Sequence, residues 1–420
     1  MGRSIVPSMW GRIVGTVRVP EPESLTSTVN DRLRANIARL EPPRRSPGID
    51  LARGLAVLGM FAAHLLAVTP LSWTAPDTWL GIVEGRSAIT FATLAGVSLG
   101  LLTTSSSREA LPADAAAPAG SGLERARESI TTRAVLIWAL GLFLLGLEVP
   151  VYVVLPAYGL LLWAGARMVG WSTRALFTAA GAAAVTGPFV VALINAGGPP
   201  APGGFAEMVS FLLGWNYPFV VWIAFVAAGL GAGRFLAHGI ARAWLLLGLG
   251  AGLAVVGYGL IGPVGNAVVD RYGEALQPGT RLWVLSVLQD FPHSSGVGEA
   301  IGSGGFALAL VALCVLIGRT PLRWVAWPLR AVGSMPLTAY TAHLIAWWIW
   351  MMLAPGSGAQ ADSLSAFRAA DPFWPMTLGI VSGCVAWTLL WGRGPLERLV
   401  HYLSETVGHL SGDAGRRPGP

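Results

Sequence analysis

The 420-residue sequence contains no lysine and few charged residues of any kind. Charged side chains make up 12% of the chain, whereas soluble globular proteins carry about 25%. Hydrophobic residues make up 54%, and the mean hydropathy is +0.60. Repeated apolar runs are long enough to cross a bilayer. The shortage of charge excludes an ordinary soluble domain and predicts an all-α, polytopic membrane protein.

Only two cysteines are present, Cys314 and Cys384, and both fall inside apolar runs. They are typical of small buried hydrophobic residues and exclude a framework of several disulfides. No spacing of histidine, cysteine and carboxylate residues suggests a metal site, so no metal cofactor is expected. The net charge of +6 comes from arginines placed mainly between the apolar runs. No basic patch interleaved with aromatic residues stands out, so we expect no nucleic-acid partner.

The apolar runs predict a bundle of about ten transmembrane helices within residues 49–394. The predicted spans are 49–68, 86–103, 134–149, 151–166, 175–196, 216–233, 243–262, 301–318, 333–353 and 374–392. Residues 1–48 carry eight arginines but no apolar core of signal-peptide length, which predicts a partly disordered cytoplasmic tail. Residues 395–420 predict an amphipathic helix along the inner surface, followed by a disordered end. Pro156 is expected to kink the fourth span, and residues 104–132 to form a flexible loop.

The arginines are distributed unequally between alternate connections. With the N-terminus inside, 23 of the 28 arginines fall on the inner side. Arg53 lies near the inner mouth of the first span, and the four outer arginines are Arg86, Arg271, Arg281 and Arg368. This positive-inside pattern predicts a multi-pass protein of the cell membrane with both termini in the cytoplasm.

The segment IDLARGLAVLGMFAAH (49–64) places three ionisable residues in the first span. Arg53 and His64 are eleven residues apart, which at about 100° per residue puts them on one helix face, roughly 16 Å apart along the axis. Asp50 lies one turn from Arg53 and is placed to pair with it. Ionisable groups inside a membrane are costly, so a functional role is the default interpretation.

This face predicts a cation at the inner end and an imidazole in the outer half of the membrane. The cation suits an anionic donor entering from the cytoplasm, and a long, thin donor could reach the imidazole along this face from below. The imidazole can take a proton from a hydroxyl or amine of an acceptor that approaches from outside. The alternative is structural: His64 bonds to a neighbouring helix, and Arg53 extends to the headgroups.

The Arg-x10-His pattern of Arg53 and His64, preceded by Asp50, resembles the signature of the acyltransferase-three membrane acyltransferases. Three further segments, GRSAITFATLAGVSLGL (85–101), NYPFVVWIAFVAAGLGAGR (216–234) and AVGSMPLTAYTAHL (331–344), resemble bacterial membrane proteins similar to the catalytic domain of heparan-α-glucosaminide N-acetyltransferase. The resemblance covers roughly residues 45–400.

The resemblance implies transfer of an acyl group, usually acetyl from cytosolic acetyl-CoA, to an acceptor outside the membrane. That acceptor would be an envelope glycan, a glycolipid or an exported small molecule. In the heparan-modifying relative the catalytic histidine lies in the outer loop after the first core span. The corresponding loop here, residues 69–85, contains no histidine. The role must therefore fall to His64, as in the Arg-x10-His relatives, or to another residue, or be absent. In the first case His64 acts as general base or transient acyl carrier, with Asp50 and Arg53 at the donor entrance.

Other polar residues are candidates for the same site. Arg86 begins the second span near the expected level of His64, where it can orient an acceptor or stabilise an oxyanion, or serve only as an interfacial anchor. Candidate substrate-binding residues are His293 in the outer FPHSSG stretch, Ser334, Thr338, Tyr340 and His343 in the ninth span, and the helix-end residues Glu148 and Tyr158. The hydroxyls of the span have a structural alternative, because they can simply bond to the backbone or hold helices together. The alternative for His293 is an exposed loop residue.

Two other classes of function fit the same residues. A transporter of a small metabolite could use the buried charges as a proton relay, although the matching halves common in transporters are not evident. A non-catalytic scaffold would tolerate the replacement of Arg53, His64 and Arg86 together. The sequence indicates neither the acceptor nor the oligomeric state.

Overall fold

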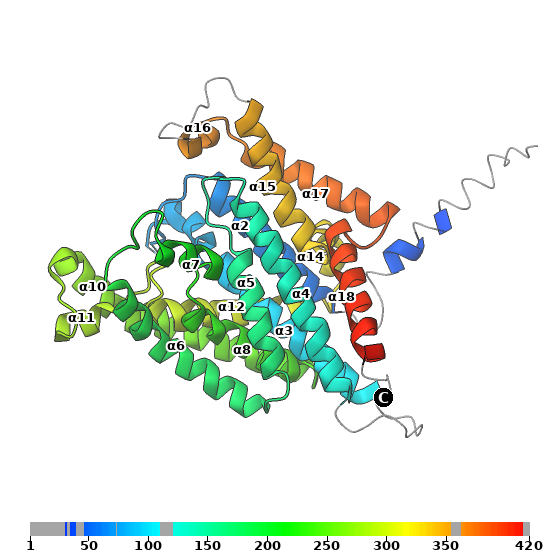
Figure 1. The fold of residues 1–420 in the computed structure, drawn as a ribbon, viewed down its shortest axis with the longest axis horizontal. Coiled ribbons are helices and arrows are strands. Elements are labelled where there is room, and N and C mark those ends of the chain that lie inside the picture. Colours follow the sequence, from blue (N-terminus) through cyan, green and yellow to red (C-terminus); the bar gives the residue numbers. More distant parts are fainter. Residues whose placement is uncertain are drawn as a thin grey trace, which may run out of the picture.

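The computed structural model describes residues 30–31, 34–38, 46–72, 74–109, 121–353 and 363–414. In this part of the chain every regular element is a helix (Figure 1). The main helices are α2 (Pro47–Leu65), α3 (Arg86–Glu109), α4 (Ser121–Leu145), α5 (Leu155–Met168), α6 (Thr173–Asn195), α7 (Phe205–Leu213), α8 (Phe219–Leu236), α9 (Ile240–Val255), α10 (Gly262–Tyr272), α12 (Val297–Ile317), α14 (Trp327–Ser334), α15 (Pro336–Leu353), α16 (Ser363–Ala369), α17 (Phe373–Leu390) and α18 (Pro395–Ala414). Shorter elements are η1 (Pro76–Val83), η2 (Val256–Ile261), η3 (Gly273–Ala275), α11 (Arg281–Ser286) and α13 (Leu322–Val325).

The predicted membrane bundle is confirmed. Eight helical stretches within the described residues are long and apolar enough to cross a bilayer. Each of the ten predicted spans overlaps a helix of the structure, and the two outside the eight are α5 and α15. The α5 helix has 14 residues, which is short for a bilayer crossing. The α15 helix contains His343 and several other polar side chains, which lower its hydropathy.

The structure corrects two details of the prediction. Much of the expected loop 104–132 is helical, because α3 continues to Glu109 and α4 already begins at Ser121. Polar residues can extend a helix beyond the membrane, so hydropathy alone underestimates its length. Pro156 does not kink a span; it lies in the first turn of α5. A proline is well tolerated there because the amide hydrogens of the first turn have no partner within the helix.

The α3 helix packs along α8, α9 along α12, α4 along α5, and α14 against α2. Glycines allow the closest approaches. A Cβ atom at Gly96 of α3 would overlap the Val226 carbonyl of α8, and one at Gly229 would overlap the Thr93 carbonyl. Small residues at helix contacts are typical of membrane bundles, where van der Waals packing holds helices together.

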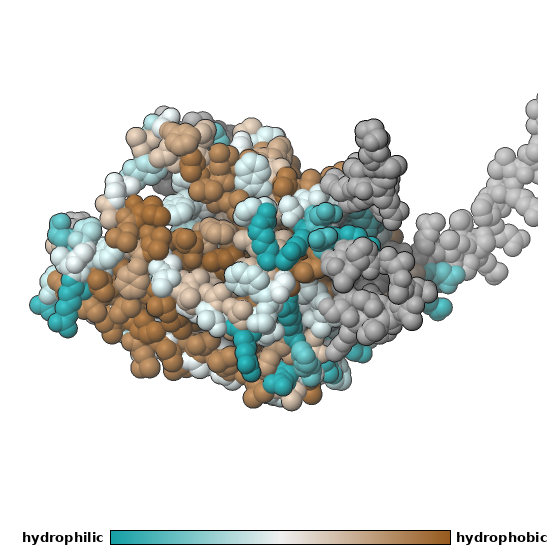
Figure 2. Space-filling view, turned by 60° about the horizontal axis from the view of Figure 1, so that its bottom comes forward, coloured by the Kyte–Doolittle hydropathy of each residue, from teal (hydrophilic) through white to brown (hydrophobic). Residues whose placement is uncertain are grey.

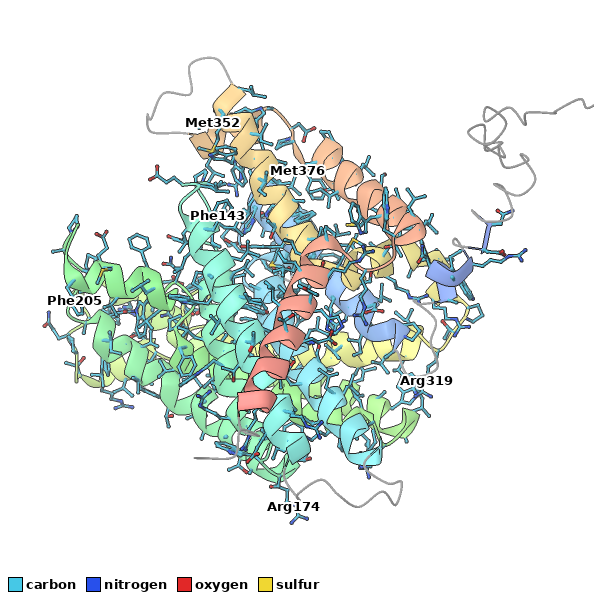
Figure 3. All side chains as sticks on the ribbon, turned by 45° about the vertical axis from the view of Figure 1, so that its right-hand side comes forward. Phe143, Arg174, Phe205, Arg319, Met352 and Met376 are labelled. Atoms are coloured by element: carbon cyan, nitrogen blue, oxygen red, sulfur yellow. The ribbon has the colours of Figure 1, made fainter. Side chains whose placement is uncertain are left out.

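Labelled residues mark the two ends of the bundle. In Figure 3, Phe143 near the end of α4 and Met352 near the end of α15 lie at the opposite end of the molecule from Arg174. The α18 helix occupies the stretch in which the sequence predicts an amphipathic helix, and it packs beside α4 and α15. Figure 2 shows broad apolar areas on the outside of the bundle, interrupted by hydrophilic residues. Most of the predicted N-terminal tail lies outside the described residues.

Candidate functional site

The polar end of α2 is arranged as the spacing predicts. Asp50 is almost completely buried, and the Arg53 guanidinium lies 3.1 Å from its carboxylate. Arg53 also donates from Nη2 to the Ser98 hydroxyl of α3, at 2.6 Å. The Arg53 side chain remains 25% exposed. A buried carboxylate thus holds a partly accessible cation at this end of the helix.

The face of α2 between Arg53 and His64 is filled. Val57, Met60 and Phe61 lie between them at helical spacing, and all three are buried in the largest hydrophobic core. This differs from the expected direct path for a thin donor along the face. A donor that contacts both ends must run beside this apolar stripe.

His64 meets a second histidine instead. Its Nδ1 atom lies 3.0 Å from Nε2 of His343 in α15. The His343 side chain is fully buried, with the rings of Phe61 and Tyr340 packed around it at centroid distances of 4.6 and 5.0 Å. The Tyr340 hydroxyl accepts a hydrogen bond from the Val154 amide at 3.3 Å. Apolar packing therefore fixes His343, and His343 in turn orients His64.

The protons on the two facing ring nitrogens can be arranged in two ways. Nδ1 of His64 faces Nε2 of His343, and either ring can be the donor, because the roles depend on the tautomer of each ring. Nδ1 of His343 has no hydrogen-bond partner among the described residues. If His64 donates from Nδ1, its Nε2 carries the lone pair that a general base needs.

Arg368 of α16 completes the surroundings of His64. Its Nε donates to the His64 carbonyl at 3.2 Å, and Nη2 donates to the Ala63 carbonyl at 3.1 Å. These carbonyls lie in the last turn of α2, where backbone acceptors lack helical partners. From the sequence, Arg368 is only one of the four outer arginines. Its contact with His64 could not be predicted, because no local motif marks it as a partner.

Arg86 lies in a separate buried cluster. Its Nε donates to the Tyr258 hydroxyl at 2.8 Å, and its guanidinium lies 4.6 Å from the centroid of that ring. The Tyr258 hydroxyl is 2.6 Å from the Ser303 hydroxyl. Tyr258 belongs to η2, a π-helical turn, a feature often found at functional sites. The structure shows no contact between Arg86 and His64 within its described residues.

Glu299, at the start of α12, holds the loop that carries His293. Its carboxylate accepts hydrogen bonds from the amides of His293 and Ser295, each at 2.7 Å. Both loop residues have positive φ, 63° and 54°, which is unusual without glycine. The His293 ring packs edge-on against Tyr217, with the ring centroids 5.9 Å apart. Burial lowers the pKa of the His293 imidazole, although the residue as a whole is exposed.

Of the remaining candidate residues, some lie beside the His64–His343 pair and others lie away from it. Tyr340 contacts His343, and the buried Tyr158 hydroxyl has no hydrogen-bond partner among the described residues. Ser334 and Thr338 lie toward the other end of the ninth span. Ser334 donates to a backbone carbonyl in α14, and Thr338 donates to Glu397 at 2.5 Å. Glu148 is exposed in the turn after α4, with a φ of 53°.

The structure thus brings together two imidazoles, those of His64 and His343, beside the Arg368 guanidinium, which is bonded to the end of α2. An imidazole can accept a proton from a hydroxyl or amine, so the pair is chemically able to act in proton transfer. In the part of the chain that the structure describes, no group of three or more histidine, cysteine and carboxylate side chains is placed to hold a metal ion.

Two known families match separate parts of the chain. Residues 45–262, slightly more than half of the sequence, match the family described as heparan-alpha-glucosaminide N-acetyltransferase, catalytic. Residues 282–406 match a second family, a protein of unknown function (DUF418). No curated protein matches the chain. His64 lies in the first matched region, and His343 and Arg368 lie in the second. The chain therefore belongs to the family of the heparan-alpha-glucosaminide N-acetyltransferase catalytic domain and is a multi-pass, membrane acetyltransferase-like protein.

Proposed function

We propose that this protein transfers an acetyl group from acetyl-CoA to a hydroxyl or amine of a cell-envelope glycan, glycolipid or exported small molecule. The observation that carries the proposal is the 3.0 Å approach of His64 Nδ1 to His343 Nε2, deep in a family-matched membrane bundle. A lone imidazole in a core is usually structural. An imidazole oriented by a second, packed imidazole has the arrangement of a catalytic base.

In the proposed reaction, His64 Nε2 removes the proton from the acceptor hydroxyl or amine as that atom attacks the thioester carbonyl. The new C–O or C–N bond forms, and the negative charge moves to the carbonyl oxygen. The intermediate then collapses, the C–S bond breaks, and the CoA sulfur takes the proton from the His64 imidazolium. His343 accepts the Nδ1 hydrogen of His64 throughout and keeps Nε2 directed at the acceptor.

The donor side is assigned to the end of α2 that carries Asp50 and Arg53. The guanidinium is anchored by Asp50 and Ser98 yet remains partly exposed, which suits the anionic phosphates of CoA. The arginine distribution of the sequence puts this end in the cytoplasm, where acetyl-CoA is made. Both termini are then cytoplasmic, and the protein belongs to the cell membrane.

The acceptor side is assigned to the opposite end, where His293, Glu299 and Arg86 lie. Glu299 fixes a strained loop through the amides of His293 and Ser295, both of which have positive φ. Strained backbone persists where the surrounding structure enforces it, often at sites that bind substrate. Arg86, held by Tyr258, offers a rigid cation that can orient a polar acceptor.

The first experiment compares acetylation of envelope glycans and lipids in cells with and without the protein, and follows label from acetyl-labelled acetyl-CoA in isolated membranes. His64→Ala should reduce transfer by about 10²–10⁴-fold, and His238→Ala, an exposed histidine elsewhere, should not. Wild-type transfer by His64→Ala would refute the proposal.

A second measurement separates an acyltransferase from a transporter. Acetyl-CoA should raise the melting temperature of the purified protein, because a ligand that binds only the folded state stabilises it. A transporter would instead respond to its solute and to a gradient. Absence of any stabilisation by CoA or acetyl-CoA would favour the transporter.

A further inference from the structure

An apolar groove opens on the outside of the bundle between α4 and α5. It has a volume of about 250 Å³ and is lined by Ala134, Val135, Trp138, Gly159, Leu160 and Trp163. The helices meet closely behind it, since a Cβ atom at Gly159 would overlap the Ala134 carbonyl. Val135 and Trp163 are 55% and 43% exposed, so the groove faces outward. In a membrane protein this face meets lipid.

Arg167 stands at one end of the groove, one turn beyond Trp163. Its guanidinium lies 3.5 Å from the centroid of the Trp163 ring, and Nη1 donates to the Trp163 carbonyl at 2.9 Å. Cation–π stacking and this hydrogen bond hold the charge at the mouth of the groove. Arg167 is exposed, so the outer edge of the guanidinium is accessible.

Arg127 reaches the same end from α4. A Cβ atom at Gly170, just after α5, would lie 2.9 Å from its Nη2. The Nε atom of Arg127 is buried and has no hydrogen-bond partner among the described residues. A buried guanidinium nitrogen without an acceptor costs free energy. The acidic residues nearest in sequence, Glu124 and Glu128, are exposed, and within the described chain neither is paired with Arg127.

The distance between the charges and the groove matches the shape of a phospholipid. Arg167 is eight residues from Gly159, which is roughly 12 Å along a helix axis. A phosphate placed between the two arginines therefore has its acyl chain alongside the groove. Pockets that combine arginines at the membrane surface with apolar helix contacts are suited to anionic lipid headgroups.

We propose that α4 and α5 form a binding site for an anionic phospholipid of the bilayer. Its phosphate lies between Arg127 and Arg167, and one acyl chain lies in the groove. The site is separate from the His64–His343 pair and does not depend on acetyl transfer. A zwitterionic lipid also has a phosphate, but its choline adds a cation near the guanidinium groups. Selectivity for the anionic lipid should therefore be on the order of tenfold.

Native mass spectrometry of the full-length protein, released from detergent, tests the proposal with phosphatidylglycerol and phosphatidylcholine of identical chains. Wild-type protein should retain one phosphatidylglycerol about tenfold better than phosphatidylcholine. The double variant Arg127→Gln/Arg167→Gln should lose this preference. Arg174→Gln removes an exposed arginine of α6 at the same end (Figure 3) and should keep it.

A groove variant separates charge from shape. Leu160→Trp fills the groove while both arginines remain, and it should weaken retention of both lipids. Equal retention of the two lipids by wild-type protein would overturn the proposal, as would an undiminished preference in the double variant. The wild-type comparison and Leu160→Trp decide the matter even if the double variant does not fold.

Discussion

Arg368 donates two hydrogen bonds to the last turn of α2, and one of them ends on the main-chain carbonyl of His64, 304 residues earlier in the sequence. The α16 helix therefore fixes the end of the helix that carries the proposed base. A cation at a helix C-terminus also interacts favourably with the helix dipole. Activity and stability should consequently both depend on a residue with no role in a local motif.

Arg368→Ala should lower the free energy of unfolding by about 1 kcal/mol, since two carbonyls lose a charged donor at a partly exposed position. Acetyl transfer should fall further than stability alone explains, because His64 is no longer held. Arg368→Lys should be intermediate, since an ammonium lacks the planar fork of the guanidinium. Thermal unfolding and labelled transfer measure the two effects. Arg281→Ala, at an exposed position, is the control; equal effects of Arg281→Ala and Arg368→Ala would contradict the assignment.

His343→Ala should reduce acetyl transfer by about 10²–10⁴-fold even though His64 remains in place. Without His343, the neutral His64 ring is free to rotate and to carry its proton on either nitrogen. His343→Gln retains a group able to accept the His64 hydrogen and should recover part of the rate. The comparison uses variants with a wild-type-like melting temperature. A folded His343→Ala variant with full activity would remove His343 from the mechanism.

Stability should vary with pH through Glu397. Burial raises the pKa of its carboxyl above the ordinary value of 4.5, although Thr338 and the Leu337 amide donate to it at the start of α15. The folded state then binds the proton more tightly than the unfolded state. The free energy of unfolding should fall as pH rises from about 4.5 to the raised pKa and remain level above it.

Thermal unfolding of wild type and Glu397→Gln in detergent, across this range, isolates the effect. The difference between the two curves of unfolding free energy against pH should fall over this range, because the other titrating groups are common to both proteins. Glu405→Gln removes an exposed carboxylate of the same helix and should leave the slope intact. A flat difference curve for Glu397→Gln would show that Glu397 does not titrate in this way.

The contact of α3 with α8 should be sensitive to a single methyl group. Gly96→Ala places a Cβ atom against the Val226 carbonyl, and backbone cannot move aside cheaply. The expected loss is about 1–3 kcal/mol, typical of overpacking. Gly379→Ala, where no atom lies within 4 Å of the added carbon, should be neutral or slightly stabilising. Melting temperatures of the two variants check this, and similar values would refute the close approach.

Most of the fold could be predicted because a membrane-spanning helix is a continuous run of apolar residues, which can be read directly from the sequence. Ten apolar runs coincide with helices, and the three-residue offset of Asp50 and Arg53 produces the ion pair that it predicts. Helix ends were less accurate, since α3 and α4 continue through polar residues that hydropathy assigns to a loop. The incorrect prediction of a kink at Pro156 has the same cause. A proline kinks a helix only in its interior, and the sequence did not show that α5 begins at Leu155.

The candidate site could be predicted only in part. His64 and His343 were each recognisable as ionisable residues inside a span. Their pairing was not, because 279 residues separate them and periodicity carries no information on such distant contacts. Glu299 and Tyr258 were missed for a related reason. Glu299 matters because it holds the His293 loop, and Tyr258 matters because it binds Arg86. Both contacts arise only in the tertiary structure.

The two imidazoles of the pair come from different family regions, one within residues 45–262 and the other within residues 282–406. A match to one of these regions alone therefore covers the position of only one of the two histidines, so such a match does not by itself indicate this pairing. Conversely, the stretch between residues 262 and 282 is the natural place to divide the chain. Two co-expressed fragments would have to reassociate within the bilayer before either histidine could find its counterpart.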